Sequence, residues 1–416
     1  MNKTFENAKI KPSVRAISSK SEAHRALICA SLADAPCFIE CSDTNADIDA
    51  TVGCLCALGA KIERNPEGFW VCPIESVTKN AALDCNESGS TLRFLLPLAA
   101  ALGADCAFIM RARLSRRPLS PLYELLESGG VTLSPVGSNP LNISGNFKSG
   151  NYSIAADVSS QYISGLLFAL SRVNGTSTVT LCGKTESAPY IFMTVNTLCA
   201  FGANISFDSN TNTFTVIGNP KLTSPSRFCV GGDWSNAAFF LAAGAIGKNA
   251  VTLTGLDEGS AQGDRAILDI LMRMGANITR ENGNVTVHPS ALRGTDVDAS
   301  DIPDLVPILA TVASVAEGKT SIYNAARLRL KESDRIESVC AMLKALGANI
   351  TATVDGMEII GKSDLSGGNV DSANDHRIAM SAAVASLACR GAVTVSRFEA
   401  INKSYPTFAE NFEGDL

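Results

Sequence analysis

The chain has 416 residues, of which 46% are hydrophobic and 18% are charged, and its formal net charge at pH 7 is -6. This composition excludes a disordered chain, and the length favours two globular domains of roughly 200 residues each. The negative net charge argues against binding to nucleic acid or to an anionic membrane. We therefore expect small-molecule partners, which a local cluster of Arg and Lys can bind even when they are anionic.

No segment of the sequence predicts export or membrane insertion. The longest apolar runs, Phe94–Ala104 and Ala237–Gly247, are shorter than the roughly 18 residues that span a bilayer, and the N-terminus lacks the apolar stretch of a secretory signal. We expect a cytoplasmic protein in which both runs form buried helices. The 13 cysteines are scattered, and the nearest pair, Cys54 and Cys56, lacks zinc-site spacing. Buried free thiols, with no metal, are the favoured interpretation.

One pattern recurs along the whole chain: an alanine-rich stretch, a turn and a short β-like run. Its copies align, at spacings of 70 to 72 residues, on Phe38, Phe108, Val179, Val251, Ile322 and Val393. A second pattern, a helix end followed by an alternating strand, has a glycine at Gly59, Gly129, Gly202, Gly275 and Gly347. We expect each of these glycines just after the end of a helix. Such self-similarity indicates repeated architecture and predicts six small α/β folding units.

Six units over two domains give three units in each domain. The run KLTSPSR, residues 221–227, places the boundary after the third unit. We predict one domain over residues 16–227 and a second, discontinuous domain made of residues 1–15 and 228–416. The N-terminal strand is then expected to pair within the C-terminal half.

The first helix of each unit is predicted to begin at a polar cluster. These clusters contain Lys20–Ser21, Ser88–Ser90, Ser159–Gln161, Asp233–Ser235, Asp304 and Asp375–Arg377. Capping of the helix explains serine and aspartate at such positions, and it is the whole explanation that we give for Ser18 or Ser19, for Asp233 and for Ser88. It does not explain Arg25 and Arg93, cations that lie about one turn inside apolar helices and oppose the helix dipole. Because helix N-termini bind anions, the pattern predicts a substrate with several negative charges.

Further charged residues and two histidines lie near these clusters. In the segment KESDR, Lys331 and Arg335 are four residues apart and Glu332 is three residues before Arg335, so they share a face if the segment is helical. The alternative is a solvated, ion-paired surface. His24 is expected to pack or to cap, and His376 is a candidate for substrate contact.

Nine blocks of the sequence, in order, resemble the 5-enolpyruvylshikimate-3-phosphate synthase family. They are SKSEAHRA (19–26), ESGSTLRF (87–94), RRPL (116–119), VSSQY (158–162), SAPY (187–190), DIPD (301–304), RLKESDRI (329–336), NDHRIAM (374–380) and NKSYPTF (402–408). The resemblance covers nearly the full length. It implies an inside-out α/β barrel of two domains, each with three βαβαββ-type units, and an active site in the cleft between them.

The resemblance implies transfer of the enolpyruvyl group of phosphoenolpyruvate to the 5-hydroxyl of 3-phosphoshikimate, a step of the shikimate pathway to chorismate and the aromatic amino acids. It implies no cofactor, a monomer and glyphosate as an inhibitor. Asp304 is implied as the base, and Glu332, with Lys20 as the rival, as the acid that protonates C3. Residues implied to hold 3-phosphoshikimate are Lys20, Ser21, Arg25, Ser159, Ser160, Gln161, Ser187, Tyr190, Asp304 and Lys331. Those implied to surround phosphoenolpyruvate are Lys20, Gly89, Arg93, Arg117, Gln161, Arg335, Arg377 and Lys403.

The chain departs from the family pattern at two places. Many members have Asn-Ala-Gly-Thr where this chain has Glu87-Ser88-Gly89-Ser90, and we expect Glu87 to turn away from the substrate or to pair with an arginine. Arg327 lies where some members place an asparagine that contacts the shikimate, and we assign it no role.

Three other functions are compatible with related folds. UDP-N-acetylglucosamine enolpyruvyl transferases normally carry a Lys-Asn pair and a reactive cysteine on a mobile loop, whereas this chain has Lys20-Ser21 and no cysteine in residues 111–117. RNA 3′-terminal phosphate cyclase is opposed by the negative net charge and by the lack of an ATP signature. A non-catalytic 3-phosphoshikimate-binding protein is disfavoured because Asp304 and Glu332 are both present.

Overall fold

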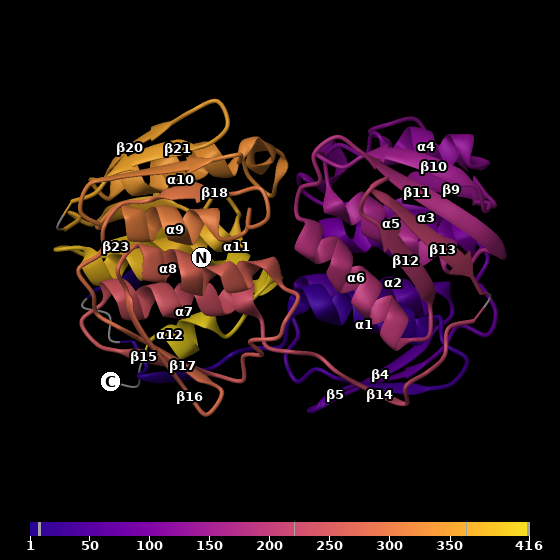
Figure 1. Ribbon diagram of the computed structural model, residues 1–416, viewed down its shortest axis with the longest axis horizontal. Coiled ribbons are helices and arrows are strands. Elements are labelled where there is room, and N and C mark those ends of the chain that lie inside the picture. Colours follow the sequence, from indigo (N-terminus) through magenta and orange to yellow (C-terminus); the bar gives the residue numbers. More distant parts are fainter. Residues whose placement is uncertain (7–9, 220, 363, 414–416) are drawn as a thin grey trace. The chain divides into compact units, whose positions relative to one another are not determined.

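The structure is a computed structural model that describes residues 1–6, 10–219, 221–362 and 364–413. The chain divides into two compact units (Figure 1): unit 1 contains Met1–Ile17 and Gly231–Leu416, and unit 2 contains Ser18–Val230. The domain boundaries predicted from the sequence lie a few residues earlier in the chain than these divisions.

Unit 2 contains three successive α/β repeats. The first consists of α1 (Lys20–Ser31), β3 (Cys37–Glu40), α2 (Ala46–Leu58), β4 (Lys61–Asn65) and β5 (Gly68–Cys72). The second consists of β6 (Ala81–Asp84), α3 (Gly89–Ala101), β7 (Cys106–Ile109), the 3-10 helix η1 (Leu114–Arg116), α4 (Leu122–Ser128), β8 (Val131–Leu133) and β9 (Leu141–Gly145). The third consists of β10 (Asn151–Ala155), α5 (Ser160–Leu170), β11 (Gly175–Cys182), α6 (Ala188–Ala200), β12 (Asn204–Asp208) and β13 (Thr213–Gly218), and β14 (Arg227–Cys229) follows.

Unit 1 begins with β1 (Asn2–Phe5) and β2 (Ser13–Arg15) and continues after residue 230. It contains the fourth, fifth and sixth repeats of the chain. The fourth consists of α7 (Trp234–Ile246), β15 (Val251–Thr254), η2 (Gly263–Ala266), α8 (Ile267–Arg273), β16 (Asn277–Glu281) and β17 (Asn284–His288). The fifth repeat consists of β18 (Asp296–Asp298), α9 (Val306–Ala313), β19 (Lys319–Tyr323), η3 (Ala326–Leu330), α10 (Arg335–Ala345), β20 (Asn349–Ala352) and β21 (Met357–Ile360). The sixth repeat consists of β22 (Gly368–Asp371), α11 (His376–Ala385), η4 (Ser386–Ala388), β23 (Val393–Ser396), η5 (Phe398–Lys403) and α12 (Phe408–Phe412).

The predicted sequence repeat is confirmed by the sheets. The six aligned residues lie in β3, β7, β11, β15, β19 and β23, each paired with a parallel strand on one side and an antiparallel strand on the other. Two sheets take their parallel strand from elsewhere in the chain: β2 pairs with β15, and β14 pairs with β3. The N-terminal strand β1 completes the last sheet antiparallel to β23, with Phe5 opposite Val393, so the expected pairing within the C-terminal half is confirmed.

The repeated glycines follow helix ends with one correction. Gly59, Gly202, Gly275 and Gly347 have positive φ values of 118°, 76°, 94° and 89°, where L side chains are disfavoured. The remaining prediction, for Gly129, is wrong by one residue: Gly129 has a φ of -82°, and the left-handed position belongs to Gly130. Gly130 donates its N–H to the carbonyl three residues earlier, that of Glu127, as Gly202, Gly275 and Gly347 do in their own repeats, so the turn that ends α4 closes one residue later.

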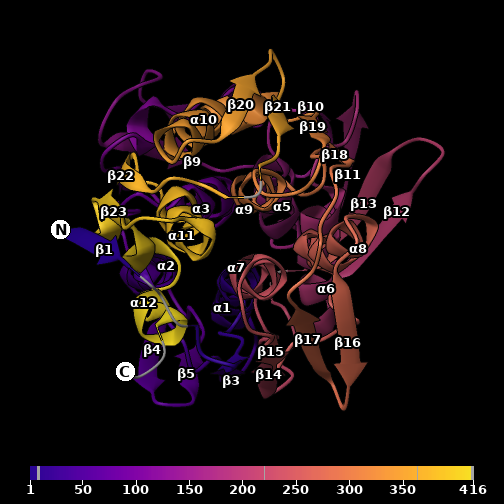
Figure 2. The same ribbon diagram turned by 90° about the vertical axis from the view of Figure 1, so that its left-hand side faces the viewer.

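Each unit buries the first helices of its repeats. In unit 1, α7, α9 and α11 contact one another, and Figure 2 shows them surrounded by the sheets of that unit, which is the inside-out arrangement expected. In unit 2, α3 and α5 approach closely because Gly165 has no Cβ, which would collide with the carbonyl oxygen of Arg93. The apolar runs predicted as buried helices lie mainly in α3 and α7. Within the described residues, no helix combines the length and apolarity needed to cross a bilayer.

Candidate active site

The predicted polar clusters lie at the start of α1, α3, α5, α7, α9 and α11, and five of these helices are capped by a side chain. Ser19, Ser88, Ser159, Asp233 and Asp375 each accept a hydrogen bond from a backbone N–H of the first turn. The helix α9 is different, because its N-cap residue Leu305 provides no side-chain bond. Asp304, directly before it, directs its carboxylate at two arginines instead.

Two arginines converge on the N-terminus of α3 in unit 2. A Cβ atom added to Gly89 would lie 2.8 Å from Nη1 of Arg117 and 3.0 Å from Nη1 of Arg93, so both guanidinium groups lie over this glycine. The backbone N–H groups of a first helical turn and paired guanidinium groups both favour a carboxylate or a phosphate. The start of α3 can therefore hold an anion that approaches the backbone of Gly89.

Gln161 connects this position to α5. Its Oε1 accepts a hydrogen bond from Nη1 of Arg93 at 2.7 Å, and its Nε2 donates to Oγ of Ser90 at 2.9 Å. The guanidinium group of Arg93 also lies over the ring of Tyr162, with its Cζ 5.5 Å from the ring centroid. These contacts fix the orientation of Arg93 across two helices.

A second group of unit 2 residues surrounds Arg25 on α1. Its Nε donates to Oγ1 of Thr194 at 2.8 Å, its Nη1 to the carbonyl of Ser21 at 2.5 Å and its Nη2 to the carbonyl of Tyr190 at 2.9 Å. Burial lowers the pKa of Arg25 to about 10, so the side chain is still charged at neutral pH. All three acceptors are neutral, and Arg25 therefore keeps a positive charge at the junction of α1 and α6. Ser187, the N-cap residue of α6, has a positive φ of 54°.

The first residue of α1 is tied to α2. The Nζ of Lys20 lies 2.9 Å from Oδ2 of Asp47, and both side chains are 15% exposed. Ser159 and Ser160 lie at the start of α5, where Oγ of Ser159 accepts from the N–H of Gln161 at 3.3 Å.

The third group lies in unit 1 and consists of carboxylates that share two buried arginines. Oδ1 of Asp304 accepts from Nη1 of Arg335 at 2.7 Å, and Oδ2 accepts from Nη2 of Arg377 at 3.0 Å. Arg335 also donates to Oε2 of Glu332 at 2.7 Å and, through Nε, to Oδ2 of Asp375 at 2.8 Å. Burial acts to raise the pKa of Asp304, but the positive charges of Arg377, Lys331 and Arg335 outweigh it and hold that pKa well below its usual range.

Two lysines lie near this group. Burial, opposed by the charge of Asp304, lowers the pKa of Lys331 to about 8. The Nζ of Lys403, at the end of η5, donates to the carbonyl of Asn374 at 2.7 Å, directly before Asp375. Arg327, to which we assign no role, donates from Nη2 to the carbonyl of Ser300.

Residues 331–334 are not helical, so the condition for a shared helical face over residues 331–335 is not met. Lys331 has an extended backbone, and α10 begins only at Arg335 because Oδ1 of Asp334 caps it by accepting from the N–H of Glu337 at 3.2 Å. Glu332 nevertheless reaches Arg335, from a bend and not from a helical turn.

The sequence model of the family described as EPSP synthase (3-phosphoshikimate 1-carboxyvinyltransferase) matches residues 6–412. The chain belongs to this EPSP synthase family. A 3-phosphoshikimate 1-carboxyvinyltransferase of Clostridium kluyveri is 41% identical over 407 residues, which cover 97% of this chain and 95% of that protein. One of Brachyspira hyodysenteriae is 40% identical over 417 residues, with 99% and 98% covered.

Solved structures agree with this membership in the EPSP synthase family. An EPSP synthase from Acinetobacter baumannii has a TM-score of 0.80 and 28% identity, with 98% of this chain and 96% of that chain covered. An enolpyruvyl transferase from Streptomyces tendae, NikO, has a TM-score of 0.80 at 21% identity, with 99% and 96% covered, and shows likeness of fold alone.

Some residues that contact the predicted EPSP synthase site were not singled out from the sequence. Asp375 was interpreted only as part of a helix start, although its block NDHRIAM had been recognised; its carboxylate, which is completely buried, is a principal partner of Arg335. Asp47 and Thr194 contact Lys20 and Arg25, and no sequence motif pointed to either of them.

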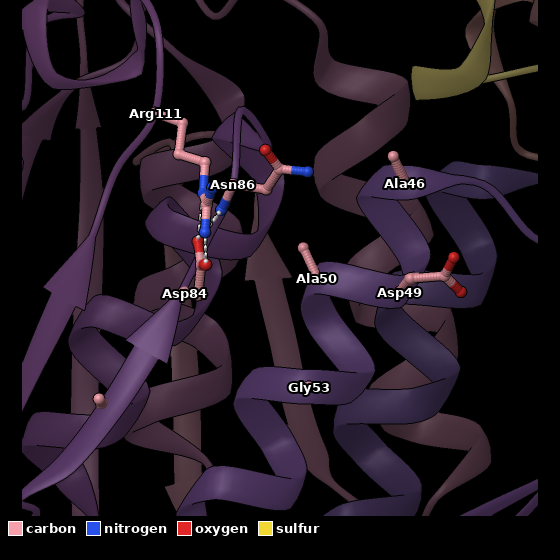
Figure 3. Close-up of a pocket in the computed structure, with 8 residues that line it drawn as sticks. Ala46, Asp49, Ala50, Gly53, Asp84, Asn86 and Arg111 are labelled. Carbon is pink, nitrogen blue, oxygen red and sulfur yellow. Dashed lines mark hydrogen bonds and ion pairs between the residues drawn. The ribbon is translucent and has the colours of Figure 1, made fainter.

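A pocket of about 500 Å³ lies in unit 2 (Figure 3). It is lined by Ala46, Asp49, Ala50, Gly53, Ala82, Asp84, Asn86 and Arg111. Arg111 is paired there with Asp84, its Nη2 lying 2.5 Å from Oδ2. None of the residues predicted to hold substrate lines this pocket.

Proposed function

We propose that the protein transfers the enolpyruvyl group of phosphoenolpyruvate to the 5-hydroxyl of 3-phosphoshikimate, with release of phosphate, in the shikimate pathway. The observation that carries this proposal is the match to the EPSP synthase family over residues 6–412, with relatives of about 40% identity along the whole chain that are named 3-phosphoshikimate 1-carboxyvinyltransferase. Neither alternative acceptor chemistry nor a non-catalytic role has a comparable observation in its favour.

The two groups in unit 2 suit the anionic parts of the substrates. We assign phosphoenolpyruvate to the start of α3, where Gly89 lets an anion approach the backbone and Arg93 and Arg117 converge. We assign the phosphate of 3-phosphoshikimate to the group around Arg25, which keeps its charge because its acceptors are neutral. Ser21, Ser159, Ser160, Ser187 and Tyr190 are proposed to bind the same substrate, and Gln161 to reach both.

The unit 1 group is proposed to perform the proton transfers. Asp304 removes the proton of the 5-hydroxyl while C3 of phosphoenolpyruvate is protonated by Glu332 or by Lys20. As an ion pair with Arg335 and Arg377, Asp304 is a poor base, because both cations stabilise its charged form.

Binding of phosphoenolpyruvate offers a way to release this base. The substrate carboxylate competes with Asp304 for the guanidinium groups of Arg335 and Arg377, which we propose as its partners together with Lys403. Each contact that Asp304 loses raises its pKa toward the ordinary range and frees an oxygen for the hydroxyl proton. The base is then activated when the second substrate is in place. The tetrahedral intermediate next loses phosphate while the residue that protonated C3, Glu332 or Lys20, takes a proton back from the methyl group, which restores the C=CH2 bond of the enolpyruvyl product.

Three finer proposals complete this assignment. We propose that the enzyme is a monomer, that glyphosate inhibits it by occupying the phosphoenolpyruvate position, and that it acts in the cytoplasm. The last is supported by its 13 free cysteines, which suit a reducing compartment.

The test is release of inorganic phosphate from a mixture of 3-phosphoshikimate and phosphoenolpyruvate, with each omitted in turn. Release that requires both substrates is the expected result. Release that requires UDP-N-acetylglucosamine in place of 3-phosphoshikimate would assign the chain to the sister transferase. Binding of 3-phosphoshikimate without any release would leave a binding protein.

A further inference from the structure

A buried chain of hydrogen bonds connects α1, α2 and α3 in unit 2. Nδ1 of His24 lies 2.7 Å from Oγ1 of Thr51, which lies 2.6 Å from Oγ1 of Thr91, and that hydroxyl donates to Oγ of Ser88 at 2.7 Å. All four side chains are completely buried. From the sequence, His24 was expected to pack or to cap. In the structure it forms one end of this chain of hydrogen bonds.

One arrangement of the hydrogens in this chain of hydrogen bonds is favoured. Among the described residues, Nε2 of His24 has no hydrogen-bond partner, so a protonated ring would bury an unpaired N–H. Burial, with the charges of Lys20 and Arg25, lowers the pKa of His24 well below its usual value, and the ring is neutral. If Nδ1 carries the hydrogen, His24 donates to Thr51, Thr51 to Thr91 and Thr91 to Ser88, and only an acceptor lone pair is left unpaired.

The far end of the chain is the N-terminus of α3. Oγ of Ser88 accepts both the hydroxyl of Thr91 and its backbone N–H, the latter at 3.2 Å, and Ser88 is the N-cap residue directly before Gly89. The first turn of α3 is thus bonded directly to α2, through Thr51, and indirectly to α1, through His24. The helix α2 also carries Asp47, the partner of Lys20.

Apolar side chains of the same shape could fill this space without burying four polar groups, so packing alone gives no reason for the chain. Directional hydrogen bonds fix a position and an orientation, which apolar contacts do less well. The place that they fix is crowded, because a Cβ atom added to Gly89 would lie only 2.8 Å from Nη1 of Arg117.

We infer that His24, Thr51 and Thr91 are positioning residues for phosphoenolpyruvate, which hold the first turn of α3 at the distance from Arg117 that the bound anion requires. This inference rests on the proposed function. The three residues act through Ser88 and Gly89 and do not touch the substrate.

The test is the isosteric substitution Thr51→Val, which removes the middle hydroxyl and keeps its volume. The expected result is a KM for phosphoenolpyruvate raised on the order of tenfold, with kcat and the KM for 3-phosphoshikimate within about twofold of wild type. The matched control is Thr197→Val, because Thr197 is also buried in unit 2 but its hydroxyl donates only to the carbonyl of Met193 in its own helix, at 2.9 Å. This control should leave all three constants unchanged.

Two substitutions of His24 test whether a donor at the position of Nδ1 restores the KM for phosphoenolpyruvate. Asparagine places a donor near the position of Nδ1, so His24→Asn should restore most of the KM for phosphoenolpyruvate that His24→Leu loses. The inference is overturned if an active Thr51→Val enzyme has a wild-type KM for phosphoenolpyruvate, if both KM values rise together, or if Thr197→Val behaves in the same way. A wild-type protein that releases no phosphate from the two substrates would instead overturn the proposed function, and this assignment with it.

Discussion

The substitution Asp304→Asn separates the two parts that we assign to this residue, a base and a partner of buried cations. Asparagine keeps the size of the side chain and one acceptor oxygen but removes the negative charge. Asp304 accepts charged hydrogen bonds from Arg335 at 2.7 Å and from Arg377 at 3.0 Å, and its side chain is 27% exposed. Because each such bond contributes about 1.5–3 kcal/mol when fully buried, and one neutral acceptor remains, we expect a loss of about 1–3 kcal/mol in the free energy of unfolding at pH 7.

The loss should depend on pH with a defined sign. The pKa of Asp304 is held below that of an unfolded aspartate, so its ion pairs stabilise the fold above pH about 4, and this contribution disappears as the pH falls through the unfolded value toward the folded one. Urea unfolding of wild type and Asp304→Asn should therefore show a difference that is largest near neutrality and shrinks below pH about 4.

Activity gives the second readout. Loss of a general base should lower kcat on the order of 10²- to 10⁴-fold. Binding of phosphoenolpyruvate, measured by titration calorimetry, should be as tight as in wild type or tighter, because the carboxylate that competes for Arg335 and Arg377 is gone. The control is Asp296→Asn, at an exposed strand position of the same unit. A near-normal kcat would refute the assignment of Asp304 as the base, and tenfold weaker binding of phosphoenolpyruvate would refute the competition that we describe.

Three further predictions follow from single contacts. Gly89→Ala places a Cβ 2.8 Å from Nη1 of Arg117, so we expect the KM for phosphoenolpyruvate to rise on the order of tenfold in steady-state assays, with a smaller change in kcat. Lys331 has a pKa of about 8, so the KM for 3-phosphoshikimate should rise as the pH increases from 7 to 9, and Lys331→Arg should remove this rise; a flat wild-type profile would contradict the assignment. Arg335→Lys cannot reproduce bonds from three guanidinium nitrogens and leaves Asp375 underpaired in the core, so urea titration should show a loss of about 3–5 kcal/mol, and a loss below 1 kcal/mol would show that lysine suffices.

The architecture was predictable because it rests on local signals that repeat. A residue such as Val179 has a parallel strand on one side and an antiparallel one on the other in every copy, so the same short alternation recurs near every 70th residue. Glycine after a helix end is equally local, and its one failure, at Gly129, is a difference of a single residue in where the turn ends.

The contacts of the site were less predictable, because they join residues distant in sequence. Asp304 resembled the other helix starts, yet α9 has no side-chain cap, and its carboxylate binds arginines 31 and 73 residues away. Nothing in the local pattern distinguishes a carboxylate that caps from one that pairs. The same limit applies to Thr51 and Thr91, 40 residues apart, which read as ordinary helix residues until the helices are packed.

The contrast between Arg25 and Arg335 suggests how the two substrates are treated differently. Arg25 donates to a hydroxyl and two carbonyls, none of which carries a charge, so an incoming phosphate finds a positive charge that is already oriented. Arg335 is surrounded by three carboxylates, so an incoming anion gains a partner there only by displacing one of them. The exposed fractions of these three side chains are 27% for Asp304, 22% for Glu332 and 0% for Asp375. Asp304 and Glu332, the two partly exposed carboxylates, are therefore the ones that an incoming anion can displace, and both are groups to which proton transfer is assigned. A base that stays neutralised until phosphoenolpyruvate binds does not act on 3-phosphoshikimate alone.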